Sequence, residues 1–153
     1  MRLKLLLSLL LVCTTAGCSN PYQTATVRGR VTAAGQPVTR GQIMFTPLVE
    51  QGSARGNNPG KPAFGVIDSQ GNYVLSTYGN QDGAVIGKHQ VTFLDDYDVS
   101  EAEEELYSNA PARYLVPPDK SELEVVAGKN EINLELVPNP EAARWKPRKA
   151  RDD

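Results

Sequence analysis

The chain has 153 residues, which is long enough for one domain and hardly for two. Its 18 acidic residues outnumber its 16 Lys and Arg residues, and the formal net charge is −2. Nothing in this balance indicates the basic face that nucleic-acid binding requires, so we expect no nucleic-acid partner.

The first residues have the pattern of an export signal. Arg2 and Lys4 are followed by an apolar run from Leu5 to Ala16. A membrane-spanning helix needs roughly 20 apolar residues, and this run has only about a dozen. We therefore predict that residues 1–17 are a signal peptide and not a transmembrane helix.

Small residues lead up to a cysteine in Thr15-Ala16-Gly17-Cys18. This sequence resembles the lipobox of bacterial lipoproteins, in which the cysteine receives a diacylglycerol group and becomes the first mature residue. Thr15 stands where the usual box has Leu, and the alternative is an ordinary signal peptide that leaves a soluble protein with a free thiol. We predict lipidation at Cys18, because two acyl chains anchor a protein stably. The protein is then expected at the cell membrane or outer membrane, facing the periplasm or the exterior.

The mature chain must be stable without a disulfide. Cys13 lies in the leader, so Cys18 is the only cysteine that remains after cleavage. Loss of Arg2 and Lys4 also leaves 14 basic against 18 acidic residues, a net charge of about −4. Stability is therefore expected to come from a packed core.

After a polar tether over residues 18–24, the chain is predicted to form one β-rich domain over residues 25–137. Short runs of β-branched and aromatic residues alternate with turn residues, which is typical of a sandwich or barrel. In the first strand, Val27, Gly29 and Val31 alternate with Arg28 and Arg30, and Gly29 leaves space for a neighbour.

About seven strands are expected in all. The others lie at residues 41–46, 63–67, 73–78, 88–94, 122–126 and 131–137. Asp68 to Asn72 predicts a tight turn, and Ala127 to Asn130 predicts a hairpin that joins the last two strands. Residues 48–62 have almost no apolar content and predict a long loop, either functional or simply tolerated.

Two segments depart from the β pattern. Ser100 to Glu103 reads as a capping box, which predicts a short helix from Glu101 to Tyr107 between strands. Residues 138–153 combine prolines with basic residues and predict a disordered basic tail. This tail is either solvated or in contact with anionic lipid headgroups.

Several motifs in order resemble those of one family. They are Gly29-Arg30-Val31-Thr32, Gly35-Gln36-Pro37-Val38, Gly41-Gln42-Ile43-Met44-Phe45, Asp68-Ser69-Gln70-Gly71-Asn72-Tyr73, Asp82-Gly83-Ala84 and Gly87-Lys88-His89-Gln90-Val91. Together they resemble the transthyretin-like, or carboxypeptidase-regulatory-like, β-sandwich lipoproteins of planctomycete bacteria, from Val27 to Leu136. The resemblance implies a single antiparallel Greek-key sandwich of about seven strands at the cell envelope, with no established chemistry.

Few residues are available for catalysis or metal binding. His89 is the only histidine, so a Ser/His/Asp triad would have to use it, and its place beside Val91 and Phe93 favours a buried structural role. Four acidic residues could bind Ca²⁺, but they lack the spacing of an EF-hand loop, so we interpret them as part of a solvated loop. They are Asp95, Asp96, Asp98 and Glu101. We expect no catalytic residue, no metal and no cofactor.

The sequence thus predicts a lipid-anchored envelope module that is not an enzyme and has a structural or protein-binding role. One alternative is a carbohydrate-binding module that stacks sugars on tyrosines, for which Tyr73, Tyr78, Tyr97, Tyr107 and Tyr114 are available. The other is a hydrolase that uses His89. The expected partners are the membrane, through the N-terminal anchor, and an envelope protein or polysaccharide.

Overall fold

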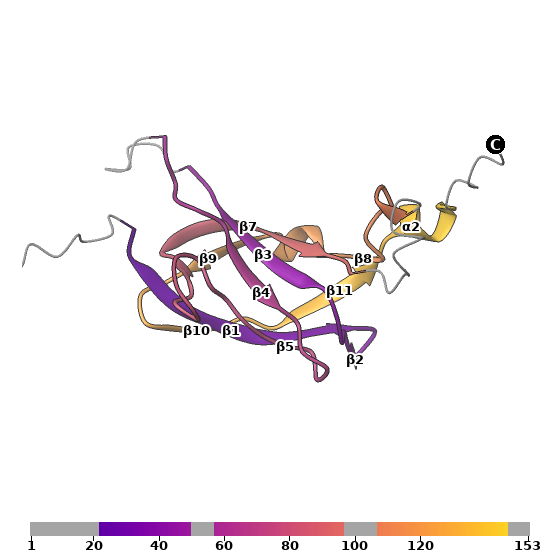
Figure 1. Cartoon of the computed structure of the whole chain (residues 1–153), viewed down its shortest axis with the longest axis horizontal. Coiled ribbons are helices and arrows are strands. Elements are labelled where there is room, and N and C mark those ends of the chain that lie inside the picture. Colours follow the sequence, from indigo (N-terminus) through magenta and orange to yellow (C-terminus); the bar gives the residue numbers. More distant parts are fainter. Residues whose placement is uncertain (1–21, 50–56, 97–106, 147–153) are drawn as a thin grey trace, which may run out of the picture.

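The computed structural model describes residues 22–49, 57–96 and 107–146, which form two packed β-sheets (Figure 1). The fold is thus an all-β sandwich, as predicted. The leader and Cys18 lie outside the described residues, as does the helix expected at residues 101–107 except for Tyr107. In the part of the chain that the structure describes, no helix is long and apolar enough to span a membrane.

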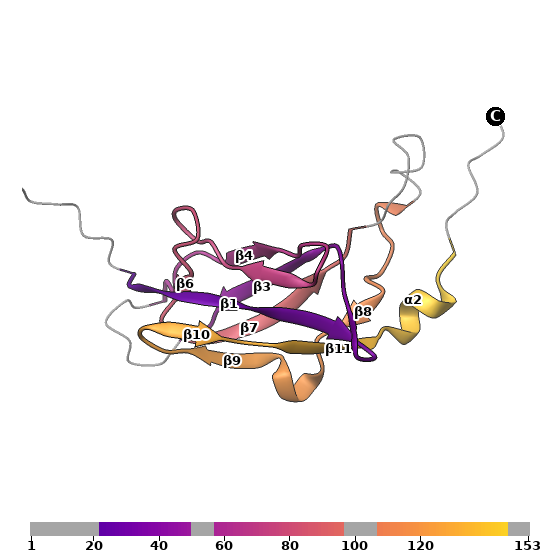
Figure 2. The same ribbon diagram turned by 90° about the horizontal axis from the view of Figure 1, so that it is seen from below.

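The first sheet is built around β1 (Thr24–Ala33), which has partners along both edges (Figure 2). One edge pairs in parallel with β10 (Lys129–Glu131) and then with β11 (Leu134–Pro138). The other edge pairs antiparallel with three short strands, β2 (Gln36–Pro37), β5 (Asn72–Val74) and β6 (Ala84–Val85). β8 (Tyr114–Leu115) extends this sheet beyond β11.

The second sheet has four antiparallel strands. Their order is β4 (Ala63–Val66), β3 (Gln42–Pro47), β7 (Gly87–Leu94) and β9 (Glu122–Val125). A 3₁₀ turn, η1 (Pro118–Lys120), leads into β9, and the short helix α2 (Pro140–Arg144) follows β11.

The predicted hairpin between the last two strands is wrong. β9 pairs with β7 in the second sheet, whereas β10 and β11 pair with β1 in the first. The buried Asn130 side chain accepts from Val126 N at 3.0 Å and donates to Val126 O at 2.8 Å. These bonds satisfy backbone groups where the chain crosses between sheets. The resemblance had implied an antiparallel sandwich. The two parallel pairs show that the first sheet is instead mixed.

The prediction of a tail without regular structure is wrong for its first part. Residues 140–144 form α2, and the buried Asn139 caps this helix by accepting from Glu141 N at 3.0 Å. The Asn139 amide also donates to Ala112 O at 2.8 Å. The helix is therefore tied to the segment before β8, and residues 147–153 lie outside the described residues.

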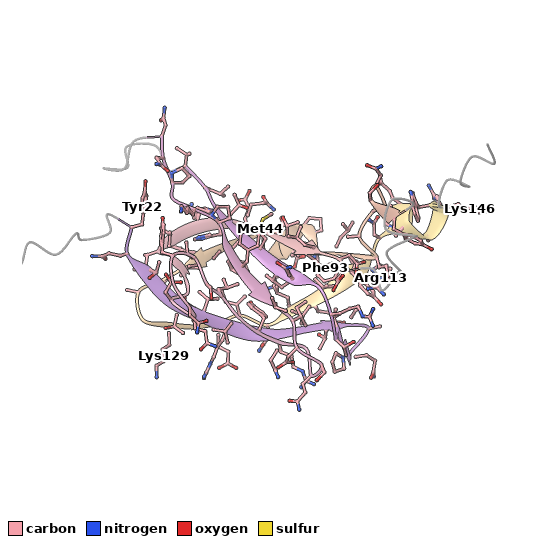
Figure 3. The ribbon with its side chains drawn as sticks, in the orientation of Figure 1. Tyr22, Met44, Phe93, Arg113, Lys129 and Lys146 are labelled. Atoms are coloured by element: carbon pink, nitrogen blue, oxygen red, sulfur yellow. The ribbon has the colours of Figure 1, made fainter. Side chains whose placement is uncertain are left out.

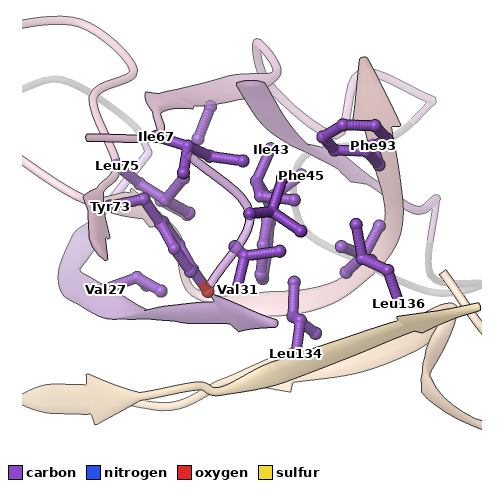
Figure 4. Packing of buried hydrophobic residues seen from close by; sticks show 14 of the residues in the cluster. Val27, Val31, Ile43, Phe45, Ile67, Tyr73, Leu75, Phe93, Leu134 and Leu136 are labelled. Carbon is purple, nitrogen blue, oxygen red and sulfur yellow. The ribbon is translucent and has the colours of Figure 1, made fainter. Parts of the chain in front are cut away.

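Alternate residues of both sheets point inward and form one core (Figure 4). Its fully buried members include Val27, Val31, Ile43, Phe45, Leu75, Leu134 and Leu136. Tyr73 lies among them and donates from its hydroxyl to Ile132 O at 2.8 Å. Burial raises the pKa of Tyr73, so its hydroxyl keeps the proton that it donates.

Candidate functional site

A groove of about 390 Å³ lies on the first sheet, where β5, β1 and the β10–β11 segment run side by side. We call it the β1–β5 groove. Its lining combines charged, amide and apolar groups and comprises Arg28, Gly29, Arg30, Asn72, Tyr73, Val74, Glu131 and Asn133.

The two arginines face outward because their strand alternates. Val27 and Val31 are buried, so Arg28 and Arg30 point to the opposite, exposed face. Their separation along the strand is about 7 Å, the repeat of two residues. An ion pair at the groove joins Arg28 Nη2 to Glu131 Oε2 at 4.0 Å, with both side chains more than 60% exposed. Such a pair is weak, and Arg30 is itself exposed, so both guanidinium groups are accessible to a ligand.

The floor of the groove is held rigidly. An ideal Cβ on Gly29 would lie 1.7 Å from Ile132 O, so only glycine allows β1 and the β10–β11 segment to approach this closely. Ile132 N donates to Arg28 O at 2.8 Å, and Arg30 N donates to Asn133 Oδ1 at 2.8 Å. These bonds fix the Asn133 amide beside the two arginines. The expectation that Gly29 makes room for a neighbour is confirmed.

An apolar hollow adjoins the groove and shares Asn72, Tyr73 and Val74 with it. Phe64 and Val66 of β4 line this hollow and are 42% and 72% exposed. A ligand that followed the surface from β1 to β4 would therefore meet two positive charges first and exposed apolar side chains next.

His89 lies in the core and away from the groove lining. It is 1% exposed, its Nδ1 lies 3.0 Å from Gly87 O, and its ring centroid lies 5.9 Å from that of Phe45. The predicted buried position is confirmed.

The acidic residues considered as calcium ligands do not gather in the described chain. Asp95 is bound by Arg113, whose Nη2 lies 2.6 Å from Asp95 Oδ1. Burial alone would raise the pKa of Asp95, but the hydrogen bonds and charge of Arg113 outweigh it and hold that pKa below its usual value. Asp96 is exposed, and Asp98 and Glu101 lie outside the described residues. No cluster of three potential ligands occurs among the residues that are described.

The tyrosines proposed as a sugar platform are dispersed. Tyr73 is in the core, Tyr114 packs edge-on against Phe93, and Tyr107 packs against Trp145. Tyr97 lies outside the described residues, and Tyr78 stacks on Tyr22 with ring centroids 6.0 Å apart. The described tyrosines therefore do not line up on one open face.

Searches against protein-family models and curated proteins found no match. Among solved structures, the chain is similar to a DUF3823 family protein from Parabacteroides merdae, with a TM-score of 0.40 and 17% identity. The similar region covers 76% of this chain and 47% of the other, so the chain spans about half the length of that protein.

Proposed function

We propose that this protein is a non-catalytic, lipid-anchored module of the cell envelope that binds an acidic segment of another envelope protein in the β1–β5 groove. The observation that carries the proposal is the pair of accessible arginines above a rigid floor. The transthyretin-like resemblance of the sequence agrees with such a role and is part of the proposal.

The absence of catalysis is inferred from the few side chains available for it. The only histidine is buried beside Phe45, and the mature chain has no cysteine besides Cys18. A histidine base needs to reach the proton that it abstracts, directly or through one water. Enclosure of His89 in the core therefore supports a structural role for it.

The anchor is tested by Cys18→Ala. We expect this variant to move from the membrane fraction to the soluble fraction, because it lacks the thiol that receives the lipid. The matched control is Cys13→Ala, since Cys13 lies in the leader and its loss should leave the distribution unchanged. Membrane retention of Cys18→Ala equal to that of the unchanged protein would contradict the anchor.

The ligand class follows from the chemistry of the groove. A guanidinium group forms two parallel hydrogen bonds to one carboxylate, and arginine is enriched at protein interfaces. Arg28 and Arg30 can thus engage successive carboxylates of an extended segment, while Phe64 and Val66 accept apolar side chains beside them.

Binding is tested with polyglutamate as a probe of carboxylate recognition. The double variant Arg28→Glu with Arg30→Glu should bind this peptide at least about tenfold more weakly, because both attractive charges are reversed. Lys120→Glu is the control, since Lys120 is also exposed but lies on η1. Titration of the purified proteins measures the effect, and equal affinity of the double variant and the unchanged protein would rule out the groove as the binding site.

An acidic polysaccharide is the alternative ligand. The amides of Asn72 and Asn133 lie beside the arginines, and such a set can bind sugar hydroxyls together with uronate carboxylates. Dispersal of the tyrosines favours the protein ligand over the sugar. Saturable binding of polygalacturonate without binding of polyglutamate would support the alternative.

A further inference from the structure

One end of the sandwich combines aromatic, apolar and basic side chains. It carries Tyr22, Val49, Lys61, Tyr78, Val126 and Lys129, and we call it the N-terminal end. Figure 3 shows Tyr22 and Lys129 at this end of the long axis, with Arg113 and Lys146 at the other. Val49 and Val126 both lie in connecting segments, and their apolar side chains are 53% and 52% exposed.

The aromatic part of this end is built onto the start of the chain. Tyr22 stacks on Tyr78 with an interplanar angle of 17°, and its hydroxyl donates to Asn58 O at 3.4 Å. Lys61 N donates to the Tyr78 hydroxyl at 3.3 Å, and the Lys61 ammonium lies 5.8 Å from the centre of the Tyr78 ring. Tyr22 is thus held against the sandwich.

In the described loops at this end the exposed charge is that of Lys61, and Lys129 adds a second positive charge at the start of β10. Asp82 is the acidic residue in these loops, and its carboxylate accepts from the backbone N–H groups of Thr77, Tyr78 and Gly79 at 2.7 to 3.0 Å. Lys61 and Lys129 are exposed. Tyrosine, lysine and small apolar groups together suit the boundary between lipid headgroups and water.

The chain between the lipidated Cys18 and Tyr22 is short enough to keep this end close to the bilayer. Only three residues lie between Cys18 and Tyr22, and the four steps from one Cα to the next span at most about 14 Å. The ten residues of β1 then carry the chain about 30 Å to the opposite end. That distance is several times the Debye length of about 8 Å at physiological salt.

We propose that the N-terminal end lies against the lipid headgroups, with its tyrosines and valines at the interface and Lys61 and Lys129 facing lipid phosphates. This inference rests on the proposed anchoring at Cys18. The sandwich then stands on the membrane, and α2 with the basic residues around it points away from the anchoring bilayer. This orientation places the described part of the basic tail, up to Lys146, away from the headgroups.

The test measures how close each end comes to the headgroups. Ala127 or Ser69 is replaced by an azide-bearing amino acid that carries a dye, since both residues are exposed and they lie in turns at opposite ends. The lipidated protein is placed in vesicles of phosphatidylglycerol and phosphatidylethanolamine that contain a nitroxide on some headgroups. We expect at least threefold stronger quenching at position 127 than at position 69.

Charge reversal tests the lysines. Lys61→Glu with Lys129→Glu should at least halve the quenching at position 127, whereas Lys120→Glu with Lys146→Glu should leave it unchanged. Equal quenching at both dye positions, or stronger quenching at position 69, would overturn the orientation. If the native protein carries no lipid, the proposed anchor fails, and the same dye measurements on protein coupled through Cys18 to a maleimide lipid decide the orientation by the same criteria.

Discussion

Gly29→Ala is expected to lower the free energy of unfolding by about 3 kcal/mol or more. The new methyl carbon would lie 1.7 Å from Ile132 O, and the nearby obstacle is backbone, not the end of a flexible side chain. β1 would have to separate from the β10–β11 segment, which strains the bond from Ile132 N to Arg28 O and the bond from Tyr73 to Ile132 O. Urea denaturation followed by circular dichroism measures the loss.

Gly79→Ala is the matched control for this change. The nearest atoms to a Cβ at Gly79 lie 3.9 Å away, in the Asp82 side chain, and the backbone there needs no positive φ. We expect its effect to stay within about 0.5 kcal/mol. A similar loss of stability in both variants would show that Gly29 has no special role in the approach of the strands.

Asp95→Asn is expected to cost about 2–3 kcal/mol at pH 6. The Asp95 side chain is 2% exposed, and it accepts hydrogen bonds from Arg113 N at 2.6 Å and Arg113 Nη2 at 2.6 Å. The substitution keeps the shape but removes the negative charge, so the guanidinium group loses this charged acceptor. Because the pair joins the residue after β7 to the residue before β8, the loss should appear in global unfolding.

The effect should depend on pH in one direction. The pKa of Asp95 is lower in the folded protein than in the unfolded chain, where it is about 3.9. Its contribution is therefore complete well above pH 4 and is lost as pH falls through the folded-state pKa. The stability difference between the unchanged protein and Asp95→Asn should shrink between pH 6 and pH 3. Asp96→Asn, at an exposed neighbouring position, should have little effect at either pH, and a difference for Asp95→Asn that grew on acidification would contradict this account.

The elements that the sequence predicted correctly are determined by neighbouring residues. Asp68 accepts from the backbone N–H groups of Gln70 and Asn72, both at 2.8 Å, and Gly71 adopts φ 87°, so the turn could be predicted from these side chains. Alternation likewise predicted the inward positions of Val27 and Val31. The same alternation placed His89 in the core.

The hairpin error came from contacts between distant residues, whereas the helix after β11 had a local signal. The turn around Gly128 shows that the chain reverses, but it does not show which sheet receives each strand. Asn139 followed by Pro140 is a recognisable helix start, yet the proline-rich basic composition of the tail outweighed it in the prediction.

The groove was missed because its lining residues are distant from one another in the sequence. Arg28 and Arg30 could be assigned to an exposed face from the alternation of their strand. Their neighbours Asn72 and Asn133 are brought to them only by the pairing of β5 and the β10–β11 segment with β1. The ion pair of Asp95 with Arg113 also spans 18 positions and has no local signal.

Photocrosslinking in intact cells tests the proposed binding function most directly. A photoreactive amino acid is placed at Asn133 in the groove and, as a control, at Glu124, which is exposed on β9 of the other sheet. Mass spectrometry then identifies what each position has captured. Our account predicts one dominant protein adduct from position 133, lost in the Arg28→Glu and Arg30→Glu background and absent from position 124. Glycan adducts alone, or the same adducts from both positions, would contradict it.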